Sequence, residues 1–573
     1  MPPPKALQMM DITSLKAVIA ELRQKAVPSR FEKAQQPEVN TIQIGLRTID
    51  GTTWVEISWS GIAPRLVETR SPKRTGGEST LAKQIQHSLK GMALIAIKQN
   101  GFERVIEFHF SSRPGEKERR ILIVEIMGNY SNLILLNEAK KVIAIGRKVR
   151  SYQSRVRPIG TGDIYLNPPT LKGLEPSIKE SFESWKSRLI LVPMSLKQSF
   201  QENYQGISPS LAKQLVDEDN SNAKKLISSS TALITDEQWQ YIYRRWKIWL
   251  KIITLEDFYL YFDGPTDFRL WKEFKAKNEN KDNIGIRLGL YYREYLDDKI
   301  IDKISNEVKQ KIEKGIEREN LGIEKQKELL LSLSEVNNLK EEADKILSSQ
   351  YPAKAMIEKA QKLYEKVKRI RRSESTLHQR IDYHNHRINF IEETRNFLEQ
   401  ALTIKTTNKT DQIKKLTELK EELNIFLKNN QPKQLNNRKN KPTIIKPMEV
   451  KSPDGLIIQI GRNHKQNDLI SIKDSRSGDV WFHAQQYPGS HVVLKASGGK
   501  KPSREDIQAA SDLAAFFSKA KRNKRVLVVI ANTENLKRIV GAPPGTVSYR
   551  SNQTIWGDPD QGKIYIEKAN PIN

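Results

Sequence analysis

Cysteine is absent from this sequence of 573 residues. Its absence excludes a disulfide scaffold and metal sites built from thiolates, and it fits a reducing compartment. No stretch approaches the roughly 20 apolar residues that a membrane-spanning helix needs. The first residues, Met-Pro-Pro-Pro, also lack the apolar core of a secretory signal. From these absences we expect a cytoplasmic protein that has no membrane partner.

Acidic residues are scarce relative to basic ones. Lys and Arg total 96 while Asp and Glu total 68, which leaves a formal net charge of +28. The positive charges either repel one another or are neutralised by a polyanionic partner, and nucleic acid is the commonest such partner of proteins. An anionic membrane surface is the alternative. The chain is also far too long for one hydrophobic core, so we expect several domains.

The first region, residues 1–170, reads as an α+β domain. Leu15, Val18, Ile19 and Leu22 recur at helical spacing and predict an opening helix. The Asp50-Gly51 step predicts a hairpin turn between two alternating segments. The segments that we predict to be strands are 41–47, 53–59, 105–110, 121–127, 132–136 and 142–145.

Residues 171–255 read as helical, and a connecting segment rich in aromatic residues follows at 256–295. Within the helical region, the run that begins at Tyr204 has the pattern of a helix–hairpin–helix. Ser208 is placed to cap the second helix, and Pro209 suits its first position. Such hairpins often offer backbone N–H groups to a phosphate, but an ordinary helix–helix turn explains this short pattern equally well.

Residues 296–428 predict a long antiparallel coiled-coil arm. One apolar stripe precedes Tyr351-Pro352 and another follows it, and the proline breaks the helix between them. Two helices of ~50 residues would each span about 75 Å. His384 and Arg395 fall on the second seam, where we interpret them as register markers. The seam positions are Leu377, Ile381, His384, Ile388, Ile391, Arg395, Leu398 and Leu402.

A polar segment at 429–442 predicts a flexible linker, and residues 443–573 predict a compact α/β domain. In that domain 20 Lys and Arg stand against 12 Asp and Glu, which leaves a charge of about +8. The segments that we predict to be strands are 456–460, 479–483, 491–495 and 525–531, with a helix at 505–520.

Two histidines of this last domain, His483 and His491, stand eight residues apart with Asp479 nearby. A metal site would need a third ligand at a diagnostic spacing, and none is present, so we predict no metal and interpret the histidines as structural or RNA-contacting residues. Ser490 and His491 follow the Pro488-Gly489 turn and are candidates for contact with a phosphate.

A basic run spans residues 519–525 at the end of the predicted helix. One interpretation is favourable charge at the negative end of the helix dipole, and the other is contact with phosphates. Five basic residues in seven exceed what a helix end needs, so the second interpretation is favoured. These residues are Lys519, Lys521, Arg522, Lys524 and Arg525. The sequence contains no P-loop and no nucleophile elbow, so we predict no catalytic residue and no cofactor.

Several motifs, in a fixed order, resemble the NFACT family. In the N-terminal half they lie at 101–108, 125–135, 155–158 and 165–169. In the C-terminal domain they lie at 461–468, 479–483, 488–494 and 509–521. The resemblance implies a multidomain α+β fold that consists of an N-terminal α/β NFACT-N domain, a helical helix–hairpin–helix region, the coiled-coil arm and a C-terminal α/β NFACT-R domain.

The resemblance also implies a function in ribosome quality control. Proteins of this family bind the large ribosomal subunit, through its rRNA, while it still carries a stalled peptidyl-tRNA. They recruit tRNA, expected to be alanyl-tRNA, and support template-free tailing of the nascent chain, which marks it for degradation. Peptidyl transfer remains the work of ribosomal RNA, so the chain is not expected to be an enzyme.

By the same resemblance, the tRNA-binding residues are Asp11, Glu103 and Arg104. Arg104 matches the family pattern, whereas Glu103 replaces an aspartate and moves the carboxylate by one methylene, which bears on the choice of tRNA. An alternative alignment places Ser14 at the position of Asp11 and removes that charge. The candidates for RNA or ribosome contact in the C-terminal domain are Arg462, Asn463, His483, Ser490, His491 and the basic run.

Two other functions remain as alternatives. One is a DNA-binding or DNA-repair protein related to formamidopyrimidine-type glycosylases, whose N-terminal domain resembles NFACT-N. Those enzymes use an N-terminal proline as nucleophile, but here Pro2 precedes two more prolines and lacks the expected acidic pattern. The other alternative is a surface adhesin that binds fibronectin, which the absence of a signal disfavours.

Overall fold

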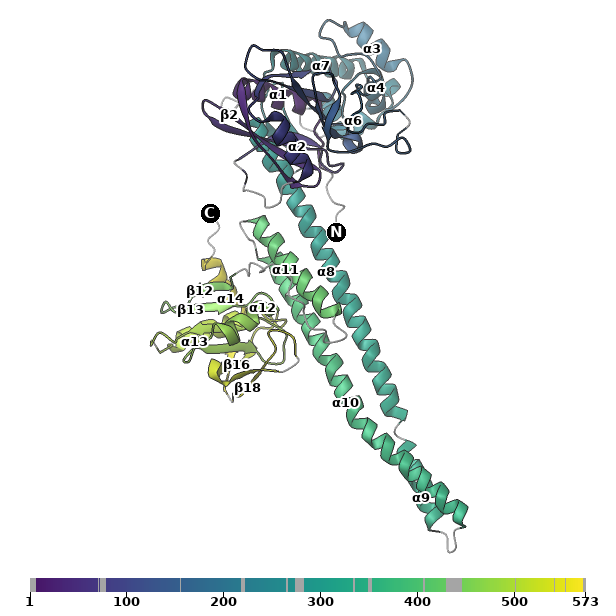
Figure 1. Cartoon of the computed structure of the whole chain (residues 1–573), viewed down its shortest axis with the longest axis vertical. Coiled ribbons are helices and arrows are strands. Elements are labelled where there is room, and N and C mark those ends of the chain that lie inside the picture. Colours follow the sequence, from purple (N-terminus) through teal and green to yellow (C-terminus); the bar gives the residue numbers. More distant parts are fainter. Residues whose placement is uncertain are drawn as a thin grey trace. The chain divides into compact units, whose positions relative to one another are not determined.

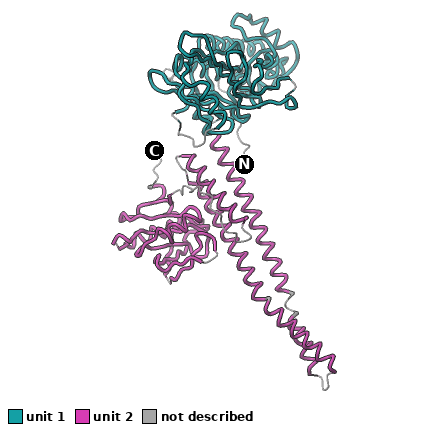
Figure 2. The backbone as a smooth tube through the Cα atoms, viewed as in Figure 1, with its two compact units in different colours: residues 1–295 teal, residues 296–573 magenta. Residues whose placement is uncertain are grey.

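The computed structural model describes residues 7–569, except 71, 73–78, 155, 218–221, 264–265, 274–282, 333–334, 349–352, 405–407, 429–445, 500, 540–541 and 552. The chain divides into two compact units, residues 1–295 and 296–573, which Figure 2 shows in teal and magenta. Among the described helices, none has the length and apolar character that crossing a membrane requires.

The first unit opens with helix α1 (Ile12–Ala26), followed by one antiparallel sheet. The order of its strands is β4-β3-β2-β1-β5-β6-β7-β8-β9, and helix α2 (Thr80–Leu89) packs against β1 and β9. The strands are β1 (Ser29–Glu38), β2 (Thr41–Thr48), β3 (Gly51–Ser58), β4 (Arg65–Thr69), β5 (Ala93–Gln99), β6 (Val105–Ser111), β7 (Arg120–Glu125), β8 (Asn132–Leu136) and β9 (Val142–Ile145).

The opening helix, the hairpin at Asp50-Gly51 and the predicted strands of this domain are confirmed. The prediction missed β1, β4 and β5. Strand β1 contains Pro37 and shifts register twice against β2, so its side chains do not alternate cleanly between the two faces. This irregular strand nevertheless joins the two halves of the sheet, because it pairs with both β2 and β5.

The helical region contains α3 (Phe182–Ile190), α4 (Leu196–Asn203), α5 (Pro209–Val216), α6 (Ala223–Ser228) and α7 (Asp236–Leu255). Its core is aromatic, since the side chains of Trp185, Trp239 and Trp246 are almost fully buried. The rings of Trp185 and Trp239 meet edge to face, with centroids 5.7 Å apart. The run from Tyr204 joins α4 to α5, and the predicted cap at Ser208 and first position at Pro209 are confirmed.

The connecting segment contains a short pair of strands, β10 (Tyr261–Phe262) and β11 (Phe268–Arg269), and the start of a long helix. Helix α8 (Ile284–Ser332) then begins twelve residues before the position predicted for the arm. The first turns of α8 pack closely on β4, because a Cβ at Gly289 would lie 2.5 Å from the carbonyl oxygen of Glu68. The first part of the arm helix therefore belongs to the N-terminal unit.

The arm in the second unit is built from α8, α9 (Glu335–Leu347), α10 (Lys354–Thr403) and α11 (Lys409–Lys428). Figure 1 shows α8 and α10 running side by side, with α11 folded back along them. The predicted break at Tyr351-Pro352 and the predicted linker at 429–442 lie outside the described residues. Helix α11 was not predicted. Its Leu416, Leu419 and Leu423 join the core that α8 and α10 share.

The predicted heptad seam describes only one face of α10. On that seam Leu377, Ile391 and Leu398 are buried, as expected. A second face, which includes Thr394 and Phe397, is also buried although it lies off the seam. This second face meets the C-terminal domain of the same unit.

The C-terminal domain is an antiparallel sheet of order β12-β13-β15-β14-β16-β19, with α13 on one face. The predicted helix is shorter than expected and ends at Phe516, so the basic run lies in the turn after the helix rather than at its end. The elements are β12 (Met448–Lys451), β13 (Ile457–Ile460), α12 (His464–Asp468), a π-helical turn (Leu469–Lys473), β14 (Val480–Ala484), β15 (Val492–Lys495), α13 (Arg504–Phe516), β16 (Val526–Asn532), β17 (Leu536–Arg538), β18 (Val547–Tyr549), β19 (Gln553–Gly557) and α14 (Pro559–Ala569).

Candidate nucleic-acid interface

Asp11 lies where two helices of the first unit begin. It is the cap of α1, and its Oδ1 accepts hydrogen bonds from the backbone N–H of Ser14 at 3.0 Å and from Ser14 Oγ at 2.7 Å. Its Oδ2 accepts a hydrogen bond from Ser208 Oγ at 2.9 Å, and Ser208 in turn caps α5. A carboxylate between two helix N-termini is well stabilised by their dipoles. Asp11 is buried and occupied by these contacts.

The hairpin turn packs on the turn between β5 and β6, which carries the other two predicted tRNA residues. Gly206 adopts a φ of +76°, and a Cβ there would lie 3.2 Å from Ile12 Cγ2 and 3.2 Å from Phe102 Cβ. Only glycine allows this turn and this approach together. The sequence did not predict the contact between Ser208 and Asp11, because the two residues are 197 positions apart.

Arg104 is half-buried close to both carboxylates. Burial lowers the pKa of Arg104, and the negative charges of Asp11 and Glu103 oppose that shift. The pKa of an arginine lies so far above neutral that the guanidinium stays protonated despite this shift. The structure therefore brings Asp11, Glu103 and Arg104 close to one another.

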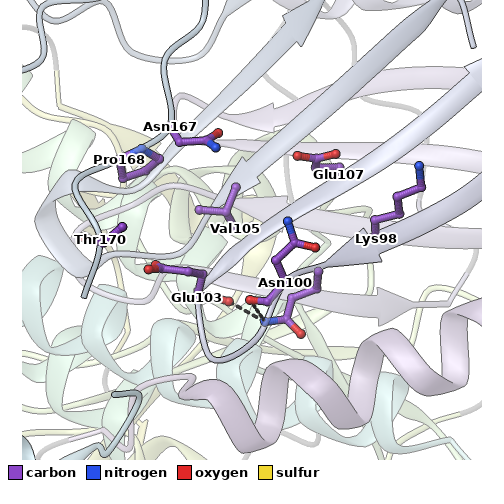
Figure 3. A pocket seen from close by; sticks show the side chains of 9 residues that line it. Lys98, Asn100, Glu103, Val105, Glu107, Asn167, Pro168 and Thr170 are labelled. Carbon is purple, nitrogen blue, oxygen red and sulfur yellow. Dashed lines mark hydrogen bonds between the residues drawn. The ribbon is translucent and has the colours of Figure 1, made fainter. Parts of the chain in front are cut away.

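Glu103 lines a small cavity that Figure 3 shows from close by. Its Oε1 accepts a hydrogen bond from the backbone N–H of Leu171 at 3.1 Å. The volume is about 110 Å³, well below the roughly 300–1,000 Å³ typical of pockets that bind small molecules. The other lining residues are Lys98, Gln99, Asn100, Val105, Glu107, Asn167, Pro168 and Thr170. We interpret this cavity as a polar recess beside Arg104 rather than as a ligand site.

In the C-terminal domain, His483 and His491 are brought together with Trp481. The two imidazole centroids lie 5.3 Å apart, and His483 stacks on the indole of Trp481 at 5.6 Å. Burial lowers the pKa of His483, and it lowers the pKa of His491 well below 6.5. Both rings are therefore neutral at physiological pH and offer no positive charge to a phosphate.

Asp479, which the metal hypothesis paired with these histidines, is fully committed to other contacts. Its carboxylate accepts hydrogen bonds from the backbone N–H groups of Arg476, Ala496 and Ser497, each at 3.0 Å. It also accepts one from Lys495 Nζ at 2.9 Å. Burial opposes ionisation, but these donors hold the pKa of Asp479 below 3.8. Across the described residues, no group of three His, Asp or Glu side chains is placed to hold a metal ion.

Arg462 and Asn463 face the arm. Burial lowers the pKa of Arg462 to about 10, and its guanidinium lies 5.0 Å from the ring centre of Phe517. Asn463 caps α12, and its Nδ2 donates to Glu418 Oε2 on α11 at 3.4 Å. Ser490 and His491 are buried as well. Asn463, Ser490 and His491 therefore present no open surface to RNA in this structure.

The contact between arm and C-terminal domain centres on His464. Its ring stacks on Phe390 of α10 with centroids 3.6 Å apart, and its Nε2 lies 2.9 Å from Thr394 Oγ1. Nearby, Asn396 Nδ2 and Gln400 Nε2 both donate to the carbonyl oxygen of Phe517 at 2.9 Å. These contacts explain why α10 buries a second face.

The basic run divides into two groups. Lys519 pairs with Glu392 at 3.1 Å and Lys521 pairs with Glu399 at 3.4 Å, both on α10. Arg522, Lys524 and Arg525 are exposed. The second group is free of the arm's acidic residues and presents positive charge to solvent.

Comparison with known proteins gives the family. The model of the NFACT N-terminal and middle domains matches residues 11–354, and that of the NFACT protein RNA binding domain matches residues 446–551. The chain belongs to the NFACT family, and the resemblance noted in its sequence is confirmed.

Two curated relatives cover nearly the whole chain. The Rqc2 homolog RqcH of Streptococcus suis is 26% identical over 599 residues, which span 95% of this chain and 97% of the relative. The protein of the same name from Bacillus subtilis is 25% identical over 580 residues, with the same shares of both chains.

Solved structures match the chain in halves. The C-terminal part of the fibronectin/fibrinogen-binding protein from Streptococcus suis is 25% identical with a TM-score of 0.37, and covers 46% of this chain and 98% of its own. The N-terminal part is 22% identical with a TM-score of 0.37, and covers 50% of this chain and 99% of its own.

Proposed function

We propose that this protein is a ribosome quality-control factor that binds the large ribosomal subunit and tRNA. The observation that carries the proposal is that relatives named Rqc2 homolog RqcH match 95% of the chain, while an RNA-binding domain matches residues 446–551. The excess of 28 positive charges fits partners made of RNA.

In this proposal the first unit holds tRNA. The planar guanidinium of Arg104 donates hydrogen bonds to a phosphate or to a base edge of tRNA. Glu103 accepts a hydrogen bond from the tRNA or orients Arg104. Asp11 acts indirectly, since its oxygens are occupied, and it supplies negative charge that keeps the Arg104 side chain in place. The recruited species would be alanyl-tRNA, with Glu103 as the residue that tests this choice.

The protein's own side chains would perform no bond chemistry. Ribosomal RNA would transfer the peptide of the stalled peptidyl-tRNA to the recruited aminoacyl-tRNA, and repetition would tail the nascent chain for degradation. The protein would accelerate this reaction by holding the reactants together, because positioning turns a bimolecular encounter into an effectively unimolecular step.

The first test is a tagged pull-down of the full chain from cells, with sequencing of the RNA that co-purifies. The wild type is expected to enrich large-subunit rRNA and one dominant tRNA. Arg104→Ala is expected to lose at least tenfold of the tRNA and to keep the rRNA, since one charge-assisted contact contributes ~1.5–3 kcal/mol. Arg113→Ala, an exposed arginine of the same domain, is the matched control and should change neither.

Two results would contradict the proposal. One is the absence of large-subunit rRNA from the wild-type sample, and the other is recovery of both subunits in equal amounts without any enriched tRNA. A dominant tRNA other than an alanine acceptor would retain the quality-control function and reject alanine as the added residue.

The division of the basic run makes a second prediction, on the salt dependence of RNA binding. Each phosphate neutralised on a single strand contributes about 0.7 to the slope of log affinity against log salt. Replacing Arg522, Lys524 and Arg525 by alanine should lower that slope by about 2 if all three contact phosphates. Replacing Lys519 and Lys521 should lower it by less than about 1, because Glu392 and Glu399 already compensate their charge.

Fluorescence anisotropy of a labelled oligoribonucleotide at several salt concentrations measures both slopes. Equal slopes for the two sets of variants would reject the assignment of phosphate contacts to the exposed group.

A further inference from the structure

Trp556 is a large aromatic residue that the C-terminal domain leaves exposed. Its relative accessibility is 55%, and it lies on β19, which is the edge strand of the sheet. A single exposed apolar side chain is ordinary in proteins, so exposure alone decides nothing. The surroundings of Trp556 are what give it a role.

The register of the sheet shows which face Trp556 occupies. Trp556 pairs with Leu527 of β16, while its neighbour Ile555 pairs with Val528 and packs into the core beneath α13. Because successive strand residues point to opposite faces, Trp556 and Leu527 share the face that lies away from α13. Their side chains are direct cross-strand neighbours, roughly 5 Å apart at Cβ.

Within the part of the chain that the structure describes, the other elements on this face cover a different region of the sheet. Ile470 and Leu536 cover the sheet around Trp481 and Val529, and they form a separate cluster with them. Leu527 and Trp556 do not belong to that cluster. Thr554, which is two residues before Trp556 on the same face, is also exposed. This end of the sheet therefore forms an open shelf, built from Leu527, Thr554 and Trp556.

Positive charge borders the shelf. Arg525 directly precedes β16 and stands two residues before Leu527, so the alternation of the strand carries it to the same face as Trp556. Arg522 and Lys524 are exposed in the same turn, and residues 519–525 contain no acidic residue. If the strand geometry continues to residue 525, its diagonal spacing to Trp556 is about 7–8 Å between Cα atoms, so both side chains border the shelf.

The carboxylate of Asp558, which follows β19, is engaged at the start of α14. Its Oδ1 accepts hydrogen bonds from the backbone N–H groups of Asp560 and Gln561. Its negative charge also acts on Asp512 of α13, which lies on the other face of the sheet. Arg525 consequently remains available to an external anion.

We propose that Trp556 stacks on an unpaired RNA base while Arg525, with Arg522 and Lys524, contacts the flanking phosphates. An aromatic platform beside a basic edge is the arrangement that binds single-stranded nucleic acid with little sequence preference. A double helix keeps its bases stacked on each other and offers none to the indole. This inference rests on the proposed RNA-binding function and adds to it the form of RNA that the shelf accepts.

The test uses the full chain with a fluorescein-labelled 12-nucleotide oligouridine, and with the same strand annealed to oligoadenosine. Trp556→Ala is expected to weaken binding of the single strand by about tenfold and to leave duplex binding unchanged. Trp556→Phe should stay within about threefold of wild type, since phenylalanine still stacks, whereas Trp556→Leu should behave like alanine. Tyr130→Ala, which removes an aromatic residue that is 84% exposed in the first unit, is the control.

The salt dependence separates stacking from charge. Trp556→Ala should leave the salt slope unchanged, while Arg525→Ala should lower it by about 0.7. If Trp556→Ala unfolds the domain, photocrosslinking of wild-type protein to a 4-thiouridine oligonucleotide replaces it, and the crosslink is expected on the peptide that carries β19.

Other outcomes overturn the inference. Unchanged affinity of a folded Trp556→Ala variant, equal loss on single strand and duplex, or crosslinks confined to other peptides would each do so. Loss of a protein partner without any loss of RNA binding would show the shelf to be a protein-docking surface instead. The proposed function fails separately, when the wild-type pull-down lacks large-subunit rRNA or recovers both subunits equally without an enriched tRNA.

Discussion

Replacing Glu319 with alanine is expected to lower the free energy of unfolding of the arm by about 3–5 kcal/mol. Glu319 of α8 is buried, and it accepts hydrogen bonds from two residues of α10, His384 Nδ1 at 2.7 Å and Arg387 Nε at 2.9 Å. Arg387 is buried as well. When the carboxylate is removed, the buried guanidinium of Arg387 is left without a counter-charge. That loss costs far more stability than the loss of an exposed ion pair.

Chemical denaturation, followed by the helical circular dichroism signal, measures this effect. Glu317→Ala is the matched control, because Glu317 is exposed on the same helix and should change stability by no more than about 0.5 kcal/mol. Similar stability of the two variants would show that the carboxylate of Glu319 does not hold the two helices together.

The dependence on pH gives an independent check of the same interaction. Burial by itself would raise the pKa of Glu319, but the hydrogen bonds from His384 and Arg387 lower it below 4.5. A carboxylate whose pKa is lower in the folded state stabilises the protein above its unfolded pKa and loses that effect as the pH falls. The difference in stability between wild type and Glu319→Ala should therefore shrink below about pH 4.5.

Asp479→Ala is expected to be as damaging in the C-terminal domain, with a loss of about 3–5 kcal/mol. The substitution leaves the Lys495 ammonium and three backbone N–H groups without their acceptor inside the domain. Unsatisfied buried donors each carry a penalty of about 1–3 kcal/mol, and some of them will reach water after relaxation. Hydrogen exchange of the β14 and β15 amides should accelerate accordingly.

Asp474→Ala is the control for this variant, because its side chain is exposed a few residues away.

The two destabilising substitutions are also expected to differ in their effect on RNA binding. Asp479→Ala should reduce binding of single-stranded RNA together with stability, since the shelf depends on the same sheet. Glu319→Ala should leave RNA binding by the C-terminal domain intact. A stable Asp479→Ala variant would reject the structural role that we assign to this carboxylate.

Local patterns predicted many of the regular elements. Alternation of apolar and polar residues is a property of a few consecutive positions, and it predicted β2, β3 and β6–β9. The cap at Ser208 and Pro209 was equally local, and both were confirmed. Strand β1 was not predicted, because Pro37 and two register shifts interrupt the alternation of its side chains. Helix α11 was not predicted as a separate helix, because its leucines pack into a core that α8 and α10 form together.

The candidate sites depended far more on contacts between distant residues. Motifs pointed to Asp11, Glu103 and Arg104, but not to Ser208. The hydroxyl of Ser208 donates a hydrogen bond to Asp11, which is 197 positions away in the sequence. The sequence left His483 and His491 as either structural or RNA-contacting residues, and only burial showed them to be neutral rings beside Trp481. No local pattern separates Lys519, paired with Glu392 of α10, from Arg525 six residues later.

The sequence alone determined the family, the basic character of the protein and the order of its domains, because composition, periodicity and motifs are properties of neighbouring residues. The tertiary structure determined which polar side chains are buried and which remain open to a partner. Burial depends on chain segments that meet only after folding. It decides whether a histidine is charged and whether an arginine can contact a partner. For that reason Trp556, which no motif singled out, became visible as a site only when its strand was seen at the edge of the sheet.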